Sequence, residues 1–458
     1  MMLVAACGSR LSKQELSSTN GGGGGGSAAA ATAGTGTGGN AGVKKGPGGP
    51  TVGTLPLPCG KAKGGAPKAP THADAGVTAN TIKVAVISDK SGQVKVPTAS
   101  VEESMQAFVD FCNSYGGING RTLQLTKIDS KLFQQLEATK QACNDKVFAI
   151  VGSGSVTDNQ GAQQMLDCGL IEVPAYTATA KKALSDNLVQ PIPNPSNHYN
   201  VGPPRFIVKE HPNAVKKAAL LFGDIAVAVD QAKRIQKAFE TAGFKFVYVK
   251  KTPVISESYT SEVQDMKSKG VQYVTMVSAL SEVQKLLRDM DTQNFKPEVV
   301  DLGQQYYDPA LPKSPGAEGA LVLLNTIPFE EIDQNAALKV YDEAYKKVGT
   351  NIQHTTLGVQ SFSAGLLFAT AVKAAGDNLT RASVLAQLKK IHSWDGGGLQ
   401  MKTDPGANKV TTCFLYMQVK GGKFVRFHPE KANTFDCSAD YDVDLHSTFG
   451  GGAKLKGG

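Results

Sequence analysis

Polar side chains follow several apolar runs in the first half of the chain, at spacings that could gather them into one binding site. Hydroxyl groups donate hydrogen bonds to carboxylates, and a helix that starts beside them adds a partial positive charge. Hydroxyl residues after successive runs therefore indicate a site for a small polar molecule. The candidates are these hydroxyl residues and the tyrosine next to Thr177: Ser91, Ser153, Ser155, Tyr176, Thr177 and Thr179.

The second half of the chain adds three candidates, Asp224, Ser278 and Tyr306. The carboxylate of Asp224 could accept hydrogen bonds from an ammonium group, and Tyr306 could flank a ligand side chain. Structural alternatives stay open for both, because Asp224 could simply begin a turn and Tyr306 could belong to the core or hinge. Likewise, Ser153 and Ser155 could only cap a helix.

The elements that must position these residues alternate between strands and helices. Short apolar runs such as 82–87 and 147–151 predict buried strands, and the segments between them have helical periodicity. This alternation predicts a parallel sheet. A Pro-rich passage at 191–204 separates one such block from a second, so the sequence predicts an α/β fold with two lobes. Small ligands bind beyond the carboxyl ends of parallel strands, where the candidates lie.

Motifs for catalysis are missing from the sequence. None of the seven histidines lies in an HExxH motif, and neither GxSxG nor a Walker A sequence occurs. Gly152-Ser153-Gly154 begins like a dinucleotide fingerprint, but Thr157 occupies the position of the third glycine. We therefore expect no cofactor, and an enzyme of unknown type is the least favoured class.

The net charge of +8 comes mostly from the two ends of the chain. Residues 1–76 carry seven Lys or Arg and two acids, whereas residues 77–449 carry 39 basic and 38 acidic residues. This balance lacks the basic face that nucleic acid requires. No uncharged apolar run approaches the roughly 20 residues that cross a bilayer, and the apolar stretch at 362–372 reads as a core helix.

The N-terminus resembles a lipoprotein signal. Val4-Ala5-Ala6-Cys7 is similar to a lipobox, in which the cysteine receives the lipid, although the charged and apolar regions of a signal peptide are missing. We expect residues 1–7 to be the residual signal, residues 8–76 a disordered Gly/Pro/Ala-rich tether and residues 450–458 a flexible Gly-rich tail. The protein is then exported and held at the outer face of the cell membrane, or in the periplasm, through lipid on Cys7.

Seven cysteines fit an oxidising compartment. We expect one disulfide between Cys143 and Cys168, whose helices would follow successive strands. A second is expected between Cys413 and Cys437, which bracket a strand and hairpin. No cluster has zinc spacing, so no metal site is predicted. The two cysteines without an assigned partner are Cys59 and Cys112.

Several stretches match a known family in their order along the chain. Ile-Lys-Val at 82–84 leads to Ser91-Gly92, the phrase GGINGR occupies 116–121, and Phe-Ala-Ile-Val-Gly occupies 148–152. The second lobe adds Ala-Ala-Leu-Leu at 218–221, with a helix that ends Phe-Glu-Thr-Ala-Gly. Over about residues 79–429 the chain resembles the type I periplasmic solute-binding proteins of ABC importers, in the branch of leucine/isoleucine/valine receptors.

The resemblance implies two Rossmann-like lobes joined by a three-segment hinge, with the ligand in the cleft between them. Lobe I would comprise 77–205 and about 327–392, and lobe II 206–326 and about 393–449. The implied function is capture of a small polar ligand by lobe closure and its delivery to a membrane permease with ATPase subunits. The alternative is a sensory or regulatory module of the same fold that signals to a membrane partner.

The resemblance also implies roles for individual residues. Ser153, Ser155 and Thr177 would bind the carboxylate and ammonium of an amino acid or related compound. The acid that family members contribute from the second lobe has no match here, because Gln-Gln-Tyr-Tyr occupies 304–307.

Overall fold

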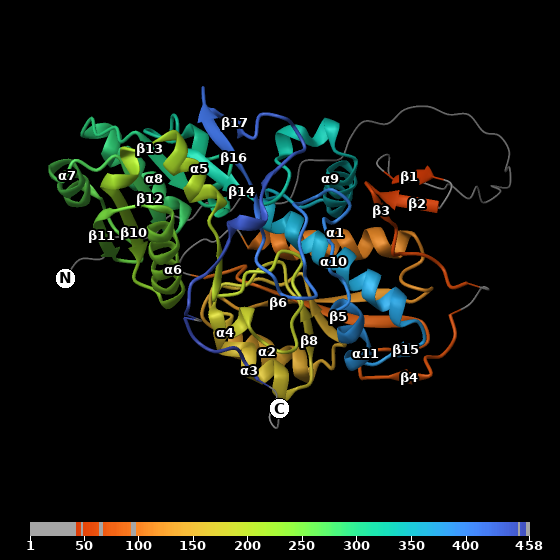
Figure 1. The fold of residues 1–458 in the computed structure, drawn as a ribbon. Coiled ribbons are helices and arrows are strands. Elements are labelled where there is room, and N and C mark those ends of the chain that lie inside the picture. The colour runs from red at the N-terminus through yellow and green to blue at the C-terminus, as the bar shows by residue number, and fades with distance from the viewer. Residues whose placement is uncertain (1–42, 47–48, 64–66, 93–97, 448, 455–458) are drawn as a thin grey trace, which may run out of the picture. The chain divides into compact units, whose positions relative to one another are not determined.

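The computed structural model describes residues 43–46, 49–63, 67–92, 98–447 and 449–454. All of them belong to a single compact unit of the chain. The two largest sheets of this unit lie in separate lobes, and helices cover both faces of each (Figure 1). The predicted α/β class with two lobes is therefore confirmed.

The first sheet has four parallel strands in the order β6-β5-β7-β8. Alternate residues of β5 face different helices: Val84 and Val86 pack with α1 and α10, whereas Ala85 and Ile87 pack with α2 and α3. Burial on both faces explains the nearly continuous apolar run of β5. The elements of this lobe are β5 (Thr81–Ser88), α1 (Ala99–Ser114), β6 (Thr122–Asp129), α2 (Gln135–Asn144), β7 (Ala149–Val151), α3 (Asn159–Asp167), β8 (Ile171–Val173), α4 (Ala180–Ala183), α9 (Ala336–Val348), α10 (Thr356–Ala375) and α11 (Arg381–Leu388).

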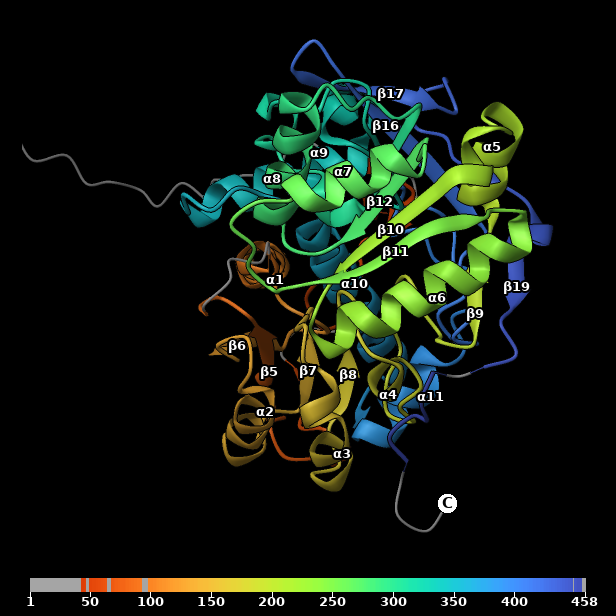
Figure 2. The ribbon, with the colours of Figure 1, turned by 90° about the vertical axis from the view of Figure 1, so that its left-hand side faces the viewer.

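The second sheet has the path β11-β10-β12-β13-β14-β16-β17, with β18 paired to β16. Its strands from β11 to β14 are parallel. Strand β16 pairs antiparallel with β14, and β17 pairs antiparallel with β16. Helices α5 and α6 cover one face, and α7 and α8 cover the other (Figure 2). The elements are α5 (Gly202–Glu210), β10 (Ala218–Gly223), α6 (Ala226–Ala242), β11 (Phe246–Thr252), α7 (Thr260–Ser268), β12 (Tyr273–Val277), α8 (Leu280–Thr292), β13 (Val299–Leu302), β14 (Leu321–Leu324), β16 (Cys413–Lys420), β17 (Lys423–His428) and β18 (Asp436–Cys437).

The chain passes between the two lobes three times: after β8, after β14 and after α11. The first crossover contains β9 (His198–Asn200), which pairs with β19 (Asp442–Asp444) near the end of the chain. Trp394 and Leu399, on the third crossover, pack in the core of the first lobe. The residue boundaries of the lobes stay predictions.

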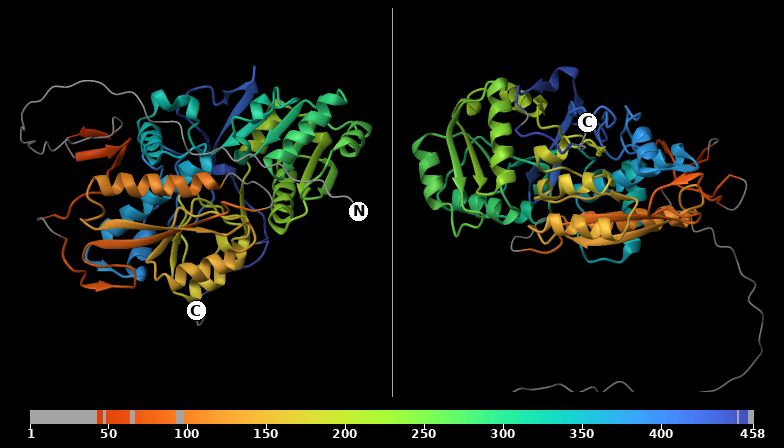
Figure 3. Two further views of the ribbon diagram at one scale, coloured as in Figure 1. Left: turned by 180° about the vertical axis from the view of Figure 1, so that it is seen from behind. Right: turned by 90° about the horizontal axis from the view of Figure 1, so that it is seen from below.

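The segment before the first lobe is more ordered than the sequence analysis predicted. Four short strands, β1 (Val43–Gly46), β2 (Gly49–Val52), β3 (Leu55–Pro56) and β4 (His72–Ala73), lie within the expected tether. Val52 and Leu57 are buried in the core beside α1, and Cys59 is bonded to Cys112 of that helix. The tether prediction is therefore wrong for the described part of 43–76, because buried apolar side chains and a disulfide anchor it. Figure 3 shows the strands of this segment, in red, along the first lobe. Residues 8–42 and Cys7 lie outside the described residues.

The glycines that made this segment look like low-complexity sequence have a structural role in at least one place. Gly53 has φ +56°, and a Cβ there would lie 2.0 Å from the carbonyl oxygen of Gly397. The amide of Thr54 donates a 3.0 Å hydrogen bond to that same oxygen. A glycine is required because two backbone segments approach this closely.

The C-terminal segment also differs from the prediction. Ala453 is buried against Ala162 and Leu166 of α3, and its amide donates to the carbonyl of Lys181. Lys454 pairs with Asp186 at 2.8 Å. Residues 450–454 are thus packed on the first lobe instead of forming a free tail, and 455–458 lie outside the described residues.

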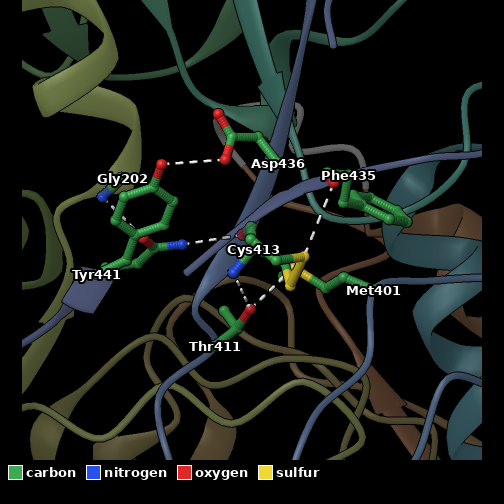
Figure 4. The surroundings of a disulfide bond; sticks show 9 residues. Gly202, Met401, Thr411, Cys413, Phe435, Asp436 and Tyr441 are labelled. Carbon is green, nitrogen blue, oxygen red and sulfur yellow. Dashed lines mark hydrogen bonds between the residues drawn. A yellow bond between two sulfur atoms is a disulfide. The ribbon is translucent and has the colours of Figure 1, made fainter. Parts of the chain in front are cut away.

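Three disulfides join described cysteines. Cys143–Cys168 links α2 to α3, and Cys413–Cys437 links β16 to β18 (Figure 4), so both predicted pairs are confirmed. Cys59–Cys112 is the pair that the sequence analysis left unassigned.

Helix α10 is the one helix of the described residues that is long and apolar enough to cross a membrane. Most of it is buried against α1 and the first sheet. We therefore interpret it as a core helix, as the sequence analysis expected for 362–372.

Candidate functional site

A cavity of about 420 Å³ is bordered by residues of both lobes and of the crossovers between them. The first lobe contributes the loop after β8 and the side of α10 that carries Gln360. The second lobe contributes the segments after β12 and β13, which carry Ser278 and Gln304. The cavity thus lies at the carboxyl ends of the strands, where an open parallel sheet binds its ligands.

The loop after β8 brings Tyr176 and Thr177 to the cavity. Asp158 holds this loop, because its carboxylate accepts hydrogen bonds from the amide of Ala178 at 2.7 Å and the hydroxyl of Thr179 at 2.5 Å. Burial raises the pKa of Asp158 to about 7. Thr177 is 4% exposed, and its hydroxyl has no hydrogen-bond partner among the described residues.

Gly154 makes room for Tyr176. A Cβ at Gly154 would lie 2.0 Å from the tyrosine ring, so a larger residue would displace it. Gly154, in the Gly-Ser-Gly turn, is therefore needed so that the ring of Tyr176 can pack against the turn. Burial raises the pKa of the Tyr176 hydroxyl well above its usual value, so this hydroxyl is neutral and can donate a hydrogen bond.

Three predicted serines of the first lobe do not line the cavity. The hydroxyl of Ser153 accepts a hydrogen bond from the amide of Ile87 at 3.0 Å. Ser155 donates to Asp89 at 3.0 Å, and Ser91 donates to a carboxylate on β6 at 2.6 Å. These side chains hold the loops at the ends of the strands. Thr179 also lies outside the cavity lining, and its hydroxyl donates a hydrogen bond to Asp158.

Of the three candidates in the second lobe, one lines the cavity and two do not. Ser278 lines the cavity. Tyr306 is fully buried, and its hydroxyl lies 2.8 Å from the carbonyl oxygen of Ser278 and accepts from the amide of the same residue at 2.9 Å. Tyr306 thus positions the segment that carries Ser278. Asp224 lies outside the lining: its side chain is 55% exposed and pairs with Lys251 at 2.9 Å.

Asp301, which the sequence analysis did not select, lines the cavity from the second lobe. One of its oxygens lies 2.7 Å from the hydroxyl of Tyr273 and 3.1 Å from that of Tyr416. Burial raises the pKa of Asp301 to about 6. An acid inside an apolar strand was the signal that could have identified it.

Arg234 was also missed, and it lies on the cavity side of α6. It is 8% exposed, and its guanidinium donates to Asn194 Oδ1 at 3.1 Å and to the carbonyl of Pro195 at 3.0 Å. The guanidinium also lies over the ring of Tyr199, with 5.8 Å between the guanidinium carbon and the ring centroid. The signal in the sequence that could have identified Arg234 was its position next to Ile235, on the apolar face of the helix.

Among the described residues, no group of three or more His, Cys, Asp or Glu side chains could hold a metal ion. The arrangement around the cavity can instead hold a small organic molecule. Its hydroxyl, amide and guanidinium groups provide hydrogen bonds, and its apolar side chains provide a surface for a hydrocarbon part.

The Cys413–Cys437 disulfide borders this site. Cys413 lines the cavity, and its carbonyl accepts a hydrogen bond from Asn200 of the first crossover at 2.9 Å (Figure 4). Tyr441 donates to Asp436 beside it at 3.0 Å. The disulfide therefore fixes β18 to the first residue of β16, where that strand meets the crossover.

Comparisons with known proteins agree with this architecture. A sequence model of a family described as periplasmic binding protein matches residues 81–423. A search of curated proteins finds no match. The leucine-binding protein LivK from Thermotoga maritima has a TM-score of 0.64 and 16% identity, over 76% of this chain and 98% of its own.

Two further solved structures differ in their bound molecules. The substrate-binding protein LivJ from Streptococcus pneumoniae, in complex with isoleucine, has a TM-score of 0.63 and 18% identity, over 75% of this chain and 98% of its own. A solute-binding protein from R. palustris, in complex with benzoate, has a TM-score of 0.65 and 16% identity, over 76% of this chain and 96% of its own. At these identities the likeness shows a shared fold.

Proposed function

The chain belongs to the periplasmic binding protein family, and we propose that it is the extracytoplasmic receptor of an ABC importer. It captures a small polar ligand, an amino acid or a related compound, between its lobes and delivers it to a membrane permease with ATPase subunits. The observation that supports this function best is the cavity, whose lining comes from both lobes. A ligand that contacts both lobes stabilises the closed arrangement over the open one.

A panel of ligands tests this function directly. The full chain is heated with amino acids, their amides, and aromatic or short-chain acids, each at a saturating concentration. A true ligand at 100 times its dissociation constant stabilises the folded state by about 2.7 kcal/mol. We expect a clear rise in melting temperature with one chemical class and none with sugars.

Uptake in the native bacterium separates transport from sensing. Deletion of the gene is expected to reduce uptake of the radiolabelled ligand, and a plasmid copy is expected to restore it. Unchanged uptake in the deletion strain, with ligand binding intact in the purified protein, would contradict an importer receptor and favour the sensory alternative.

We also propose that Cys7 carries the lipid that holds the receptor at the membrane, on the basis of the lipobox-like Val4-Ala5-Ala6-Cys7. A Cys7→Ser variant, expressed with a full signal peptide, is expected in the soluble exported fraction. A Cys59→Ser variant is the matched control, since Cys59 is committed to a disulfide, and it should stay with the membrane. Membrane association of Cys7→Ser would contradict the anchor.

A further inference from the structure

The last described residues of the chain contact both lobes. Leu445 is 1% exposed in the core of the second lobe, and its amide donates a 2.8 Å hydrogen bond to the carbonyl of Asn197 in the first crossover. Phe449 packs against the same core. Ala453 is 1% exposed against α3 of the first lobe. The end of the chain therefore connects the two lobes in addition to the three crossovers.

Backbone hydrogen bonds attach this segment to the first lobe on both sides of Ala453. Its amide donates to the carbonyl of Lys181 at 3.0 Å, and its carbonyl accepts from the amide of Asp186 at 3.3 Å. The carboxylate of Asp186 also pairs with Lys454 at 2.8 Å. The segment is thus held by α4 and the turn that follows it. Helix α4 directly follows the loop that brings Thr177 to the cavity, so this attachment lies close to the candidate site.

The packing of the segment is tight at one glycine. A Cβ at Gly452 would lie 1.9 Å from the carbonyl oxygen of Leu184 and 2.8 Å from its Cβ. A Cβ at the neighbouring Gly451 would meet nothing within 4 Å among the described residues. Only a glycine at 452 therefore lets the segment lie against the first lobe, whereas position 451 tolerates a side chain.

The chain between the two attachments is short. Ala453 follows Phe449 by four residues, and an extended chain spans at most about 3.6 Å per residue, or about 14 Å in all. The attachment points cannot move further apart than this unless Phe449 leaves the second lobe or Ala453 leaves the first. Wider opening must then break these contacts, so they stabilise the described arrangement relative to a more open one.

We propose that residues 449–454 form a strap that limits the opening of the lobes in the protein without ligand. The strap lies outside residues 81–423, which match the family, so the inference is drawn from the contacts of this chain alone. It goes beyond the proposed receptor function, because it concerns the free protein. The expected consequence is a narrower range of distances between the lobes than the three crossovers alone would allow.

Spin labels on the two lobes measure this range. Lys140→Cys on α2 and Arg288→Cys on α8 carry the labels, since these side chains are 45% and 48% exposed. The full chain also carries Cys7→Ser, so that no other free thiol remains beside the three disulfides. Double electron-electron resonance, recorded without ligand, then gives the distribution of distances between the labels.

Gly452→Ala is the variant that displaces the strap, because its Cβ collides with the backbone at Leu184. It is expected to shift the distribution of distances between the labels to longer values and to broaden it. Gly451→Ala is the matched control and should keep the distribution of the unsubstituted strap. Hydrogen exchange at the amides of Ala453 and Asp186 checks the displacement, since both amides should exchange faster in Gly452→Ala than in Gly451→Ala.

A truncated chain that ends at Phe449 covers the case in which Gly452→Ala leaves the strap in place. It lacks residues 450–458 and with them every contact of the strap with the first lobe. It is expected to show the same shift to longer distances between the labels. Because no core residue of either sheet is removed, the two lobes are expected to keep their far-ultraviolet circular dichroism.

An unchanged distribution of distances in the truncated chain would overturn the inference. The same holds for Gly452→Ala if the two amides exchange faster. A lower melting temperature alone would not rescue it, because that result shows only that the segment stabilises the first lobe. The receptor function is tested separately by the ligand panel and by uptake, so either one can fail without the other.

Discussion

At the scale of single residues, position next to a strand end did not decide which hydroxyls line the cavity. Tyr176, Thr177 and Ser278 line it, whereas Ser153 and Ser155 turn back to bond the loops that end the strands. Both groups carry hydroxyls, and both follow the end of a strand in the sequence. The difference is the direction of the side chain, which depends on the loop conformation.

We therefore expect Thr177 and Ser153 to respond oppositely to substitution. Thr177→Val should weaken ligand binding by about 1–3 kcal/mol, through the loss of one hydrogen bond to the ligand. Ser153→Ala should leave the affinity unchanged and lower the free energy of unfolding by about 1–3 kcal/mol, because the amide of Ile87 loses its buried partner. Calorimetric titration and urea unfolding measure the two effects, and a loss of affinity in Ser153→Ala alone would contradict the assignment.

Asp158 gives a prediction for pH. Burial raises its pKa from the ordinary 3.8 to about 7, so the folded chain binds more protons than the unfolded chain between these values. Protonation thus favours folding, and this contribution is lost as the pH rises towards 7. Relative to Asp158→Asn, the wild-type protein should lose on the order of 2–4 kcal/mol of unfolding free energy between pH 4 and pH 7. Urea unfolding at several pH values measures this, and parallel curves for the two proteins would contradict it.

At the scale of elements, regular periodicity predicted the helices and strands of both lobes, but composition misled at the two ends. Glycine and proline frequency indicated disorder for the described part of 43–76, whereas three features hold this segment: a disulfide, buried Val52 and Leu57, and the close approach at Gly53. Low complexity argues against a separate core, but such a segment can still pack on a core that already exists.

Gly53→Ala tests whether this packing stabilises the protein. The substitution should lower the free energy of unfolding by at least about 1 kcal/mol, because the new Cβ would lie 2.0 Å from the carbonyl oxygen of Gly397 at a positive φ. Gly60→Ala is the matched control, since a Cβ there meets nothing within 4 Å. Equal stability of the two variants in thermal unfolding would show that the segment adapts or contributes little.

At the scale of the whole molecule, two lobes joined by three crossovers form one cavity between them. Such a hinge allows the lobes to close on a ligand that contacts both. Hydrogen bonds of Asn194 with Thr177 and Arg234 connect the loop after β8, the first crossover and α6 of the second lobe. Binding and closure are therefore expected to be coupled.

Small-angle scattering can measure this coupling. A saturating ligand should reduce the radius of gyration of the wild-type protein. At a ligand concentration near the wild-type dissociation constant, Thr177→Val should show a smaller decrease than the wild type, because a smaller fraction of the variant is bound. An unchanged radius of gyration in a protein shown to be saturated by calorimetry would contradict closure.

The sequence by itself determined the α/β class, the two lobes and two of the three disulfides among the described residues. Periodic burial and strand-helix alternation are local patterns, and they can be detected without knowing which elements meet. The cavity depended on the tertiary structure. Arg234 and Asp301 lie on α6 and β13, far along the chain from Thr177, and only packing of the lobes and crossovers brings them to the same space. Side-chain direction and long-range contact, which decide whether a polar residue serves a ligand or its own loop, are not encoded in local spacing.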